Sequence, residues 1–439
     1  MGGPARILTR VDAVAIIVGI VIGAGIFRFP SLVAASLPSV PDVLAVWLAG
    51  GAISLIGALC YAELASAFPD AGGEFHFLTR AYGWRVGTLF VWARMTVIQS
   101  GSIALLAFVF GDYAVQLLPI GPNGAAVYAA LLILALTFLN FTGARPTAAA
   151  QRLFFAVTLV GLVLLIGASL AGAPLSAAVE AVPPGPGLAG FGVAMILVLL
   201  TYGGWNEAAY ISAEVKGGGH AFAWALIWGV GIVTVAYVAA NAAFLYVLGL
   251  GGLARSQALA ADIMGARLGT AGADAITVVI LLFILDSVNV TLFTGARTNY
   301  AAGRDLAPLA FLGRWDERRA TPWAGLGAQC LVALALVGLG TIDRRGVETL
   351  VDYVAPVFWL FFLLTGIAVF VLRRNEPDAL RPFRIPLYPL EPIVFCLCAG
   401  YLLYASLSYT GIGALAGVIV LASGLPLLLF GKAGKGNAS

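Results

Sequence analysis

A long apolar run near the start of the chain is interrupted at its centre by two glycines. The run extends from Val11 to Leu37, and Gly23-Ala24-Gly25-Ile26-Phe27 lies in its middle. Glycine costs helix stability relative to alanine. Backbone that leaves the helix inside hydrocarbon must find partners in the protein or in a water-filled cavity, because lipid has none. We therefore predict a membrane helix that is broken near the middle of the bilayer.

The sixth apolar span, near residues 188–216, is interrupted in the same way by Tyr202-Gly203-Gly204-Trp205-Asn206. Taken alone, Gly19 and Gly23 equally fit a packing face, because small residues four apart let helices approach closely. The second interruption adds a Trp, an Asn and the carboxylate of Glu207, which packing does not require. Two interrupted spans in matching halves of a chain indicate the binding site of a transporter.

Composition places nearly the whole chain in a membrane. Hydrophobic residues make up 61% of the 439 residues and charged residues 10%. Apolar windows of about twenty residues, each long enough to cross a bilayer, recur about twelve times. We predict an all-α membrane protein with about 12 transmembrane helices and no soluble domain. The four cysteines lie in or beside apolar spans and the chain has two histidines, so neither a disulfide framework nor a zinc or haem site is expected.

The distribution of basic residues predicts the topology. With the N-terminus in the cytoplasm, 18 of the 24 Lys and Arg residues fall on the cytoplasmic side. The positive-inside rule therefore favours cytoplasmic N- and C-termini and an even number of spans. Helices 1–5 (residues 11–172) and helices 6–10 (residues 188–372) then run in opposite orientations, followed by helices 11–12 (residues 387–430). This is the 5+5 inverted repeat of a LeuT-type fold, with helices 1 and 6 broken.

The two breaks together suit an α-amino acid. The N–H groups of Gly23, Ala24 and Gly25 and the positive end of the outer half of helix 1 favour a carboxylate. The carbonyl groups near Ile22, Leu200 and Thr201 end helical segments and favour an ammonium group. The complete set of predicted substrate-binding residues is Ile22, Gly23, Ala24, Gly25, Ile26, Leu200, Thr201, Tyr202, Gly203, Trp205 and Asn206.

These motifs resemble those of a known family, the amino acid–polyamine–organocation permeases, and within it the L-type amino acid transporter branch. The likeness rests on the two breaks, on residues 57–64 (GALCYAEL), on Gly72-Gly73-Glu74, and on residues 287–297 of span eight. It covers the first ten spans. The resemblance implies that Trp205 and Asn206 line the side-chain pocket. Where the L-type pattern has an aromatic gate, this chain has Leu200, which leaves the gate and the substrate size open.

The function that follows is secondary transport of amino acids across the plasma (inner) membrane by alternating access. A sodium- or proton-independent amino acid or amine exchanger remains open, as does a non-transporting amino acid sensor. An enzyme would need a nucleophile and base or a carboxylate constellation, and none is found in the sequence. We expect no cofactor and no nucleic-acid partner. Animal L-type transporters join an accessory subunit through a cysteine between spans three and four; residues 119–124 contain no cysteine, so no covalent subunit is expected.

A further expected partner is a coupling cation. Sodium-independent relatives place a lysine in span five at the position of a sodium ion, and the resemblance puts Thr158 there. Span eight contains the mid-membrane acid Asp286, which should bind a cation or be protonated unless it pairs with Arg94. The predicted site comprises Gly19, Ile22, Thr158, Asp286, Ser287 and Thr291. Sodium, proton and no coupling all remain open.

Other charged residues carry further predictions. Arg28 lies one turn outside the first break, where an unpaired cation is costly, and Asp352 in span ten lies at a compatible depth for an outer gate. Arg94 either extends to water or pairs with an acid such as Glu63. Glu207 either complements a helix N-terminus or contributes to substrate choice. His76 and His220 are interpreted as solvated loop residues.

Overall fold

The computed structural model describes residues 8–70, 72–142, 160–171, 188–305, 307–316, 321–342, 346–408 and 411–429. Across these ranges the chain is helical, and its only β-type pairings are two isolated bridges, Leu8 with Val215 and Asp316 with Thr321. The prediction of an all-α protein is confirmed. Thr158 and the loop before helix 6 lie outside the described residues.

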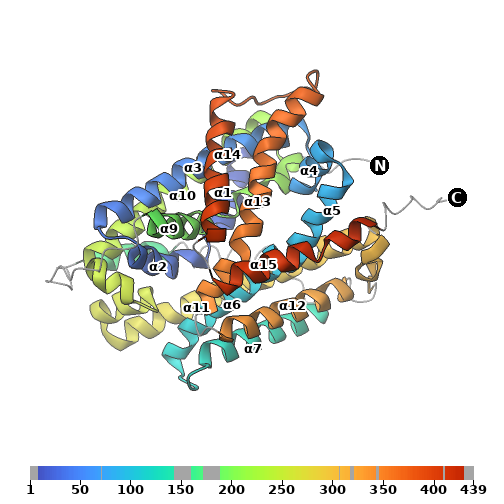
Figure 1. The fold of residues 1–439 in the computed structure, drawn as a ribbon. Helices are drawn as coiled ribbons and strands as arrows, with labels where there is room; N and C mark the ends of the chain where they lie inside the picture. Colours follow the sequence, from blue (N-terminus) through green and yellow to red (C-terminus); the bar gives the residue numbers. More distant parts are fainter. Residues whose placement is uncertain are drawn as a thin grey trace. The chain divides into compact units, whose positions relative to one another are not determined.

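The chain packs into two compact units (Figure 1). The first comprises Met1–Gly87, Ile166–Leu259 and Phe358–Tyr409. In it α10 packs against α1, α2 and α3, and α9 packs against α2, α3 and α14. Its elements are α1 (Arg10–Val21), η1 (Ala24–Phe27), α2 (Phe29–Ser36), α3 (Val40–Ala67), α4 (Glu74–Tyr82), α9 (Leu188–Thr201), η3 (Trp205–Glu214), α10 (Gly218–Arg255) and α14 (Leu390–Ser408).

The second unit comprises Thr88–Leu165, Ala260–Val357 and Thr410–Ser439. Its α6, α7 and α12 pack against one another, and α7 and α12 run side by side in Figure 1. The elements are η2 (Arg94–Gln99), α6 (Ser100–Leu117), α7 (Gly124–Phe141), most of α11 (Leu259–Asp305), η4 (Ala307–Gly313), α12 (Trp323–Ile342), α15 (Ile412–Ala422) and η5 (Leu425–Leu429). Helices α5 (Trp84–Ala93) and α13 (Gly346–Asn375) contribute residues to both units.

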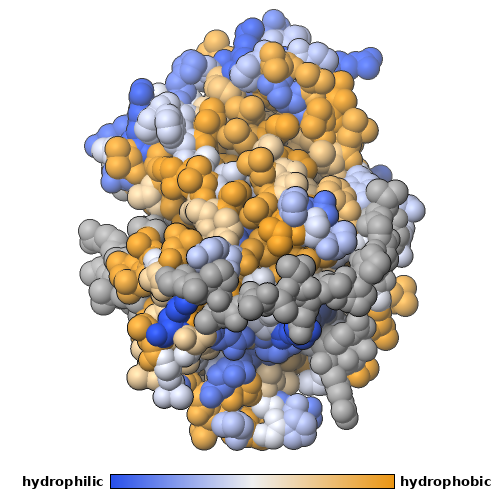
Figure 2. All heavy atoms as spheres, turned by 90° about the vertical axis from the view of Figure 1, so that its left-hand side faces the viewer, coloured by the Kyte–Doolittle hydropathy of each residue, from blue (hydrophilic) through white to orange (hydrophobic). Residues whose placement is uncertain are grey.

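Nine helices of the described chain are long and apolar enough to cross a membrane. The other expected spans are the first and sixth, which are broken, and the fifth, of which the helix Val160–Leu170 is described. Large apolar side chains face outward: Phe138, Val235 and Leu331 are each 71% exposed, and Figure 2 shows broad apolar areas on the face that it draws. Such a surface requires lipid around it. The expected division into inverted repeats stays a prediction.

Two helices are much longer than a bilayer crossing because each contains a glycine that turns the chain. In α10, Gly249 has φ 65°, and in α11, Gly269 has φ 70°. Positive φ is a glycine conformation and interrupts a right-handed helix. The segment between these two glycines contains the end of α10 and the beginning of α11.

Candidate functional site

The first break lies where the sequence predicted it. Helix α1 begins with a capping box, in which the Thr9 N–H donates to Asp12 Oδ2 at 2.9 Å and the Asp12 N–H donates to Thr9 Oγ1 at 3.2 Å. The helix ends at Val21, and Gly23 is fully extended with φ −110° and ψ 177°. A short 3-10 turn, η1, and helix α2 follow. The helix is therefore interrupted for about one turn.

The second break centres on Gly204. Helix α9 ends at Thr201, and Gly204 has φ 110°, a left-handed conformation that favours glycine. A Cβ added at Gly204 would lie 2.9 Å from the carbonyl oxygen of Ile20 in α1. A Cβ at Gly25 would lie 3.3 Å from both Thr201 Cγ2 and the Phe29 ring. The two breaks thus approach each other through backbone, and the absence of side chains on these glycines permits it.

One tyrosine, which no sequence pattern singles out, joins the two breaks. Tyr237 of α10 is fully buried, and its hydroxyl donates to the carbonyl oxygen of Val21 at 2.8 Å and, more weakly, to that of Thr201 at 3.3 Å. The ring packs against Tyr202 at 5.1 Å and Trp47 at 5.7 Å between centroids. Two carbonyl groups that lose helical partners at the breaks are therefore satisfied by one side chain.

The residues of the site that are accessible to solvent are mainly glycines, so the accessible atoms are mainly backbone atoms. The four glycines Gly23, Gly25, Gly203 and Gly204 are partly accessible. By contrast, most predicted residues that carry side chains are buried, namely Ile22, Ile26, Thr201, Tyr202, Trp205 and Asn206. Leu200 is partly accessible. A small ligand reaching this region therefore meets peptide groups first, which is the chemistry that a zwitterion needs.

Trp205 belongs to an aromatic cluster. Its ring is edge-on to Tyr61 at 5.0 Å, to Phe362 at 5.4 Å and to Phe395 at 6.4 Å between centroids. Aromatic pairs in this geometry fix each other's orientation. A Cβ at Gly57 of α3 would lie 2.7 Å from the Trp205 ring, so this glycine makes room for it. The role of Trp205 in the pocket for the substrate side chain stays a prediction.

The coupling residues of span eight lie on α11. Asp286 and Ser287 are partly buried; the Ser287 hydroxyl donates to the Phe283 carbonyl at 3.0 Å and the Thr291 hydroxyl donates to the Ser287 carbonyl at 2.7 Å. Both hydroxyl oxygens keep a lone pair with which to bind a cation. Gly19 and Ile22 lie on the N-terminal side of the first break, in the first unit. The cation site stays a prediction.

The two residues of the predicted outer gate have partners within their own units. The buried Arg28 guanidinium donates to the Ser256 carbonyl at 3.1 Å and to Gln257 Oε1 at 2.8 Å. Asp352 Oδ2 accepts from the Gly411 N–H at 3.2 Å. These contacts explain how the Arg28 charge is solvated by protein groups. A gate between Arg28 and Asp352 stays a prediction.

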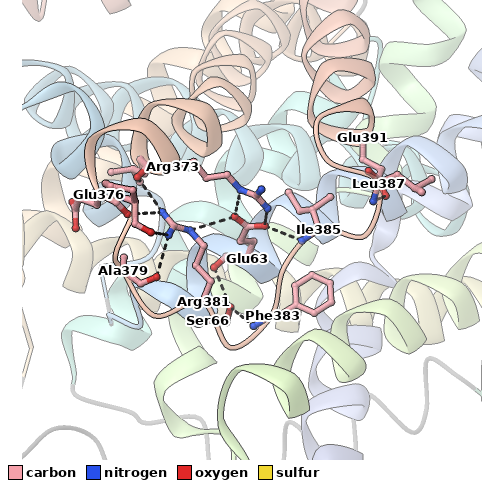
Figure 3. A network of polar contacts seen from close by, with 12 residues as sticks. Glu63, Ser66, Arg373, Glu376, Ala379, Arg381, Phe383, Ile385, Leu387 and Glu391 are labelled. Carbon is pink, nitrogen blue, oxygen red and sulfur yellow. Dashed lines mark hydrogen bonds and ion pairs between the residues drawn. The ribbon is translucent and has the colours of Figure 1, made fainter.

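Glu63 is the centre of a buried ionic network that the sequence did not reveal (Figure 3). Its side chain is 2% exposed. It accepts from Arg373 Nη2, from Arg373 Nε at 2.7 Å and from the Ile385 N–H at 2.8 Å, and Arg381 Nε lies 3.6 Å away. The network joins α3 to the end of α13 and to the segment between α13 and α14. The sequence had named Glu63 only as a possible partner of Arg94, and its described partners are two other arginines.

The remaining titratable residues named in the sequence lie in different surroundings. The two histidines are on helices rather than in loops: His76 of α4 has its Nδ1 3.8 Å from Asp70 Oδ2, and His220 of α10 is exposed. Arg94 is buried on the π-helical stretch η2, so it does not extend to water. Glu207 is partly buried in the first turn of η3, and its two predicted roles stay open.

A family model described as "Amino acid permease" matches residues 8–424, which include both breaks. The chain belongs to the amino acid permease family. The predicted resemblance to the L-type branch is confirmed by its relatives. The large neutral amino acids transporter small subunit 2 of Rattus norvegicus is 31% identical over 436 residues, covering 96% of this chain and 80% of the relative. The b(0,+)-type amino acid transporter 1 of Mus musculus is 30% identical over 406 residues, covering 90% and 81%. The human b(0,+)-type transporter is 29% identical over 417 residues.

Proposed function

We propose that the chain is a secondary transporter of amino acids that works by alternating access, with its substrate bound at the paired breaks of helices 1 and 6. The observation that supports this most directly is the approach of Gly204 to the Ile20 carbonyl, with accessible backbone on both sides. The family membership supports the same class of substrate. The relatives are named as amino acid transporters rather than as enzymes.

The orientation of the substrate follows from the helix ends. Gly23 caps η1 (Ala24–Phe27), and the N–H groups of residues 23–25 have no intrahelical partner, so they suit the substrate carboxylate. The carbonyl groups of Ile22 and Leu200 lie at the ends of α1 and α9 and suit the ammonium group. Leu200 and Thr201 contribute less than Ile22, because the Leu200 carbonyl already accepts from the Gly203 N–H at 3.1 Å and the Thr201 carbonyl from Tyr237. The side chain of the substrate would extend toward Trp205 and Asn206.

We propose further that the protein lies in the plasma membrane with both termini in the cytoplasm, as the distribution of its basic residues favours. The large neutral amino acids transporter among the relatives is named a small subunit. In this chain the residues between α6 and α7 contain no cysteine, and the four cysteines lie in α3, α12 and α14. We therefore propose that no partner is attached through a disulfide. Migration of the native membrane protein as a single species on a non-reducing gel tests this.

Uptake into proteoliposomes tests the transport function. Purified protein is reconstituted into liposomes that are empty or preloaded with amino acid, and uptake of each of the twenty proteinogenic L-amino acids is measured. We expect saturable uptake of at least one of them. Binding without uptake under every condition would identify a sensor, and neither binding nor uptake would refute the proposal.

The same preparation separates the three modes of coupling when a sodium or proton gradient is imposed. Acceleration by one gradient that is lost in Asp286→Asn would support a cation site on α11. Exchange that ignores both gradients and survives Asp286→Asn would leave the protein an uncoupled exchanger and Asp286 a structural residue.

A further inference from the structure

A second buried carboxylate lies beside the helix 6 break, outside the predicted substrate site. Glu74 is the first residue of α4 and is 3% exposed. It follows Gly73, whose φ of 48° turns the chain into the helix. A carboxylate at a helix N-terminus is stabilised by the helix dipole. Burial of a charged group also requires specific hydrogen-bond donors, since desolvation is costly.

The described donors connect Glu74 to the break. The Tyr61 hydroxyl donates to Glu74 Oε1, and Asn206 Nδ2 donates to Oε2 at 3.5 Å. On its other side, Asn206 Oδ1 accepts from the N–H of Gly204 at 3.3 Å. The chain of contacts therefore runs from the carboxylate through one amide group to the left-handed glycine at the centre of the break. Asn206 cannot rotate without losing one of the two contacts.

The aromatic cluster around Trp205 also contacts these hydrogen-bonded residues. Tyr61, which donates to Glu74, also packs edge-on against Trp205 at 5.0 Å and against Phe77 of α4 at 6.5 Å between ring centroids. The residues on either side of the Trp205–Asn206 peptide bond are thus positioned by Tyr61 and Glu74. At the other end of α4, Arg80 forms a two-fold hydrogen-bonded pair with Glu376 at 2.7 and 2.6 Å.

We propose that Glu74 is a positioning residue for amino acid binding: it orients Asn206 and through it holds Gly204 in the conformation that opens the break to the substrate. This inference rests on the proposed function. Its physical basis is that Asn206 presents an N–H group to Glu74 and an oxygen to Gly204 at the same time. Glutamine in place of Glu74 keeps one acceptor oxygen for two donors, so Asn206 and Tyr61 compete for it and the break samples other conformations. We therefore expect replacement of Glu74 to lower the affinity for the substrate.

The test compares Glu74→Gln with Glu376→Gln. The second substitution is the control, and it removes the carboxylate that pairs with Arg80 at the other end of α4. Uptake is measured with the proteinogenic amino acid that the wild-type protein takes up best. We expect Glu74→Gln to raise KM by about tenfold, the effect of one charge-assisted hydrogen bond, while Vmax changes less than twofold. Glu376→Gln should leave KM within twofold. An unchanged KM in Glu74→Gln would overturn the inference.

A double-mutant cycle tests the route through Asn206. If Glu74 acts through that amide, Glu74→Gln should add nothing to the KM of Asn206→Ala. Losses in affinity that multiply would overturn the inference.

A second variant covers the case in which Glu74→Gln fails to elute as a single species in size exclusion. Tyr61→Phe removes one donor to the same carboxylate and should raise KM by about threefold. An unchanged KM in Tyr61→Phe would overturn the inference. Failure of the wild-type protein to take up any amino acid would instead refute the proposed function, and with it this role.

Discussion

Replacing Tyr237 by Phe removes one oxygen atom from the point where the two helix breaks meet. The tyrosine is fully buried, and its hydroxyl lies 2.8 Å from the Val21 carbonyl and 3.3 Å from the Thr201 carbonyl. Phenylalanine keeps the ring contacts with Trp47 and Tyr202, so packing is retained. What is lost is one good hydrogen bond and one weak one, and two buried carbonyl groups lose a partner.

The expected magnitude follows from that loss. Leaving a buried acceptor unsatisfied costs about 1–3 kcal/mol. If that cost falls on the substrate-binding conformation, affinity for the amino acid drops about 5- to 150-fold, since 1.4 kcal/mol corresponds to about tenfold. If it falls on the fold as a whole, the melting temperature drops and affinity does not change. We expect the first result, because both acceptors belong to the breaks themselves.

The assay is amino acid uptake across a range of concentrations, with thermal unfolding of the same preparation. Tyr246→Phe is a matched control, because Tyr246 lies on the same helix and is 45% exposed. The control should have wild-type KM and melting temperature. Wild-type affinity in Tyr237→Phe would refute the view that this hydroxyl holds the breaks in their binding geometry.

Three further substitutions test the account. Gly25→Leu should abolish uptake in a protein that still elutes as a single species in size exclusion, because its side chain would fill the position assigned to the substrate carboxylate; normal binding in isothermal titration would contradict this. Gly204→Ala should impair uptake and cost about 1–2 kcal/mol or more from its left-handed φ, whereas Gly231→Ala, with nothing within 4 Å of the added atom, should not; equal uptake by the two would contradict the close approach of the breaks. Glu63→Gln should lower the free energy of unfolding by about 3–5 kcal/mol, as expected when one partner of a buried ion pair is removed, and Glu376→Gln by about 0–1 kcal/mol, as expected for an exposed pair; equal melting temperatures would contradict the network in Figure 3.

The sequence predicted the features that depend on local chemistry. Glycines at the centre of apolar runs located both breaks, because a helix in lipid tolerates such a sequence only where protein replaces its lost hydrogen bonds. By contrast, the sequence did not single out Gly249 and Gly269, which turn the chain within α10 and α11 through φ values that other residues rarely take.

Features built from distant residues were missed. Tyr237 lies 216 residues from Val21 and 36 residues from Thr201, and a tyrosine within an apolar helix has no pattern that marks it as a hydrogen-bond donor to another helix. Glu63 and Arg373 are 310 residues apart, so the sequence could indicate only that a buried acid near the end of α3 needs a partner. Glu74 is recognisable in the sequence only as part of the motif Gly72-Gly73-Glu74. Its proximity to Asn206 depends on how α4 packs against the broken helix.

The most direct test of the central claim is a cryo-electron microscopy map of the protein in lipid nanodiscs with its best-transported amino acid bound. The account predicts density for the amino acid between residues 22–25 and 200–204, with its carboxylate near the N–H groups of Gly23 and Gly25 and its ammonium group near the carbonyl of Ile22. Density at any other position, with the two breaks empty at saturating ligand, would contradict it.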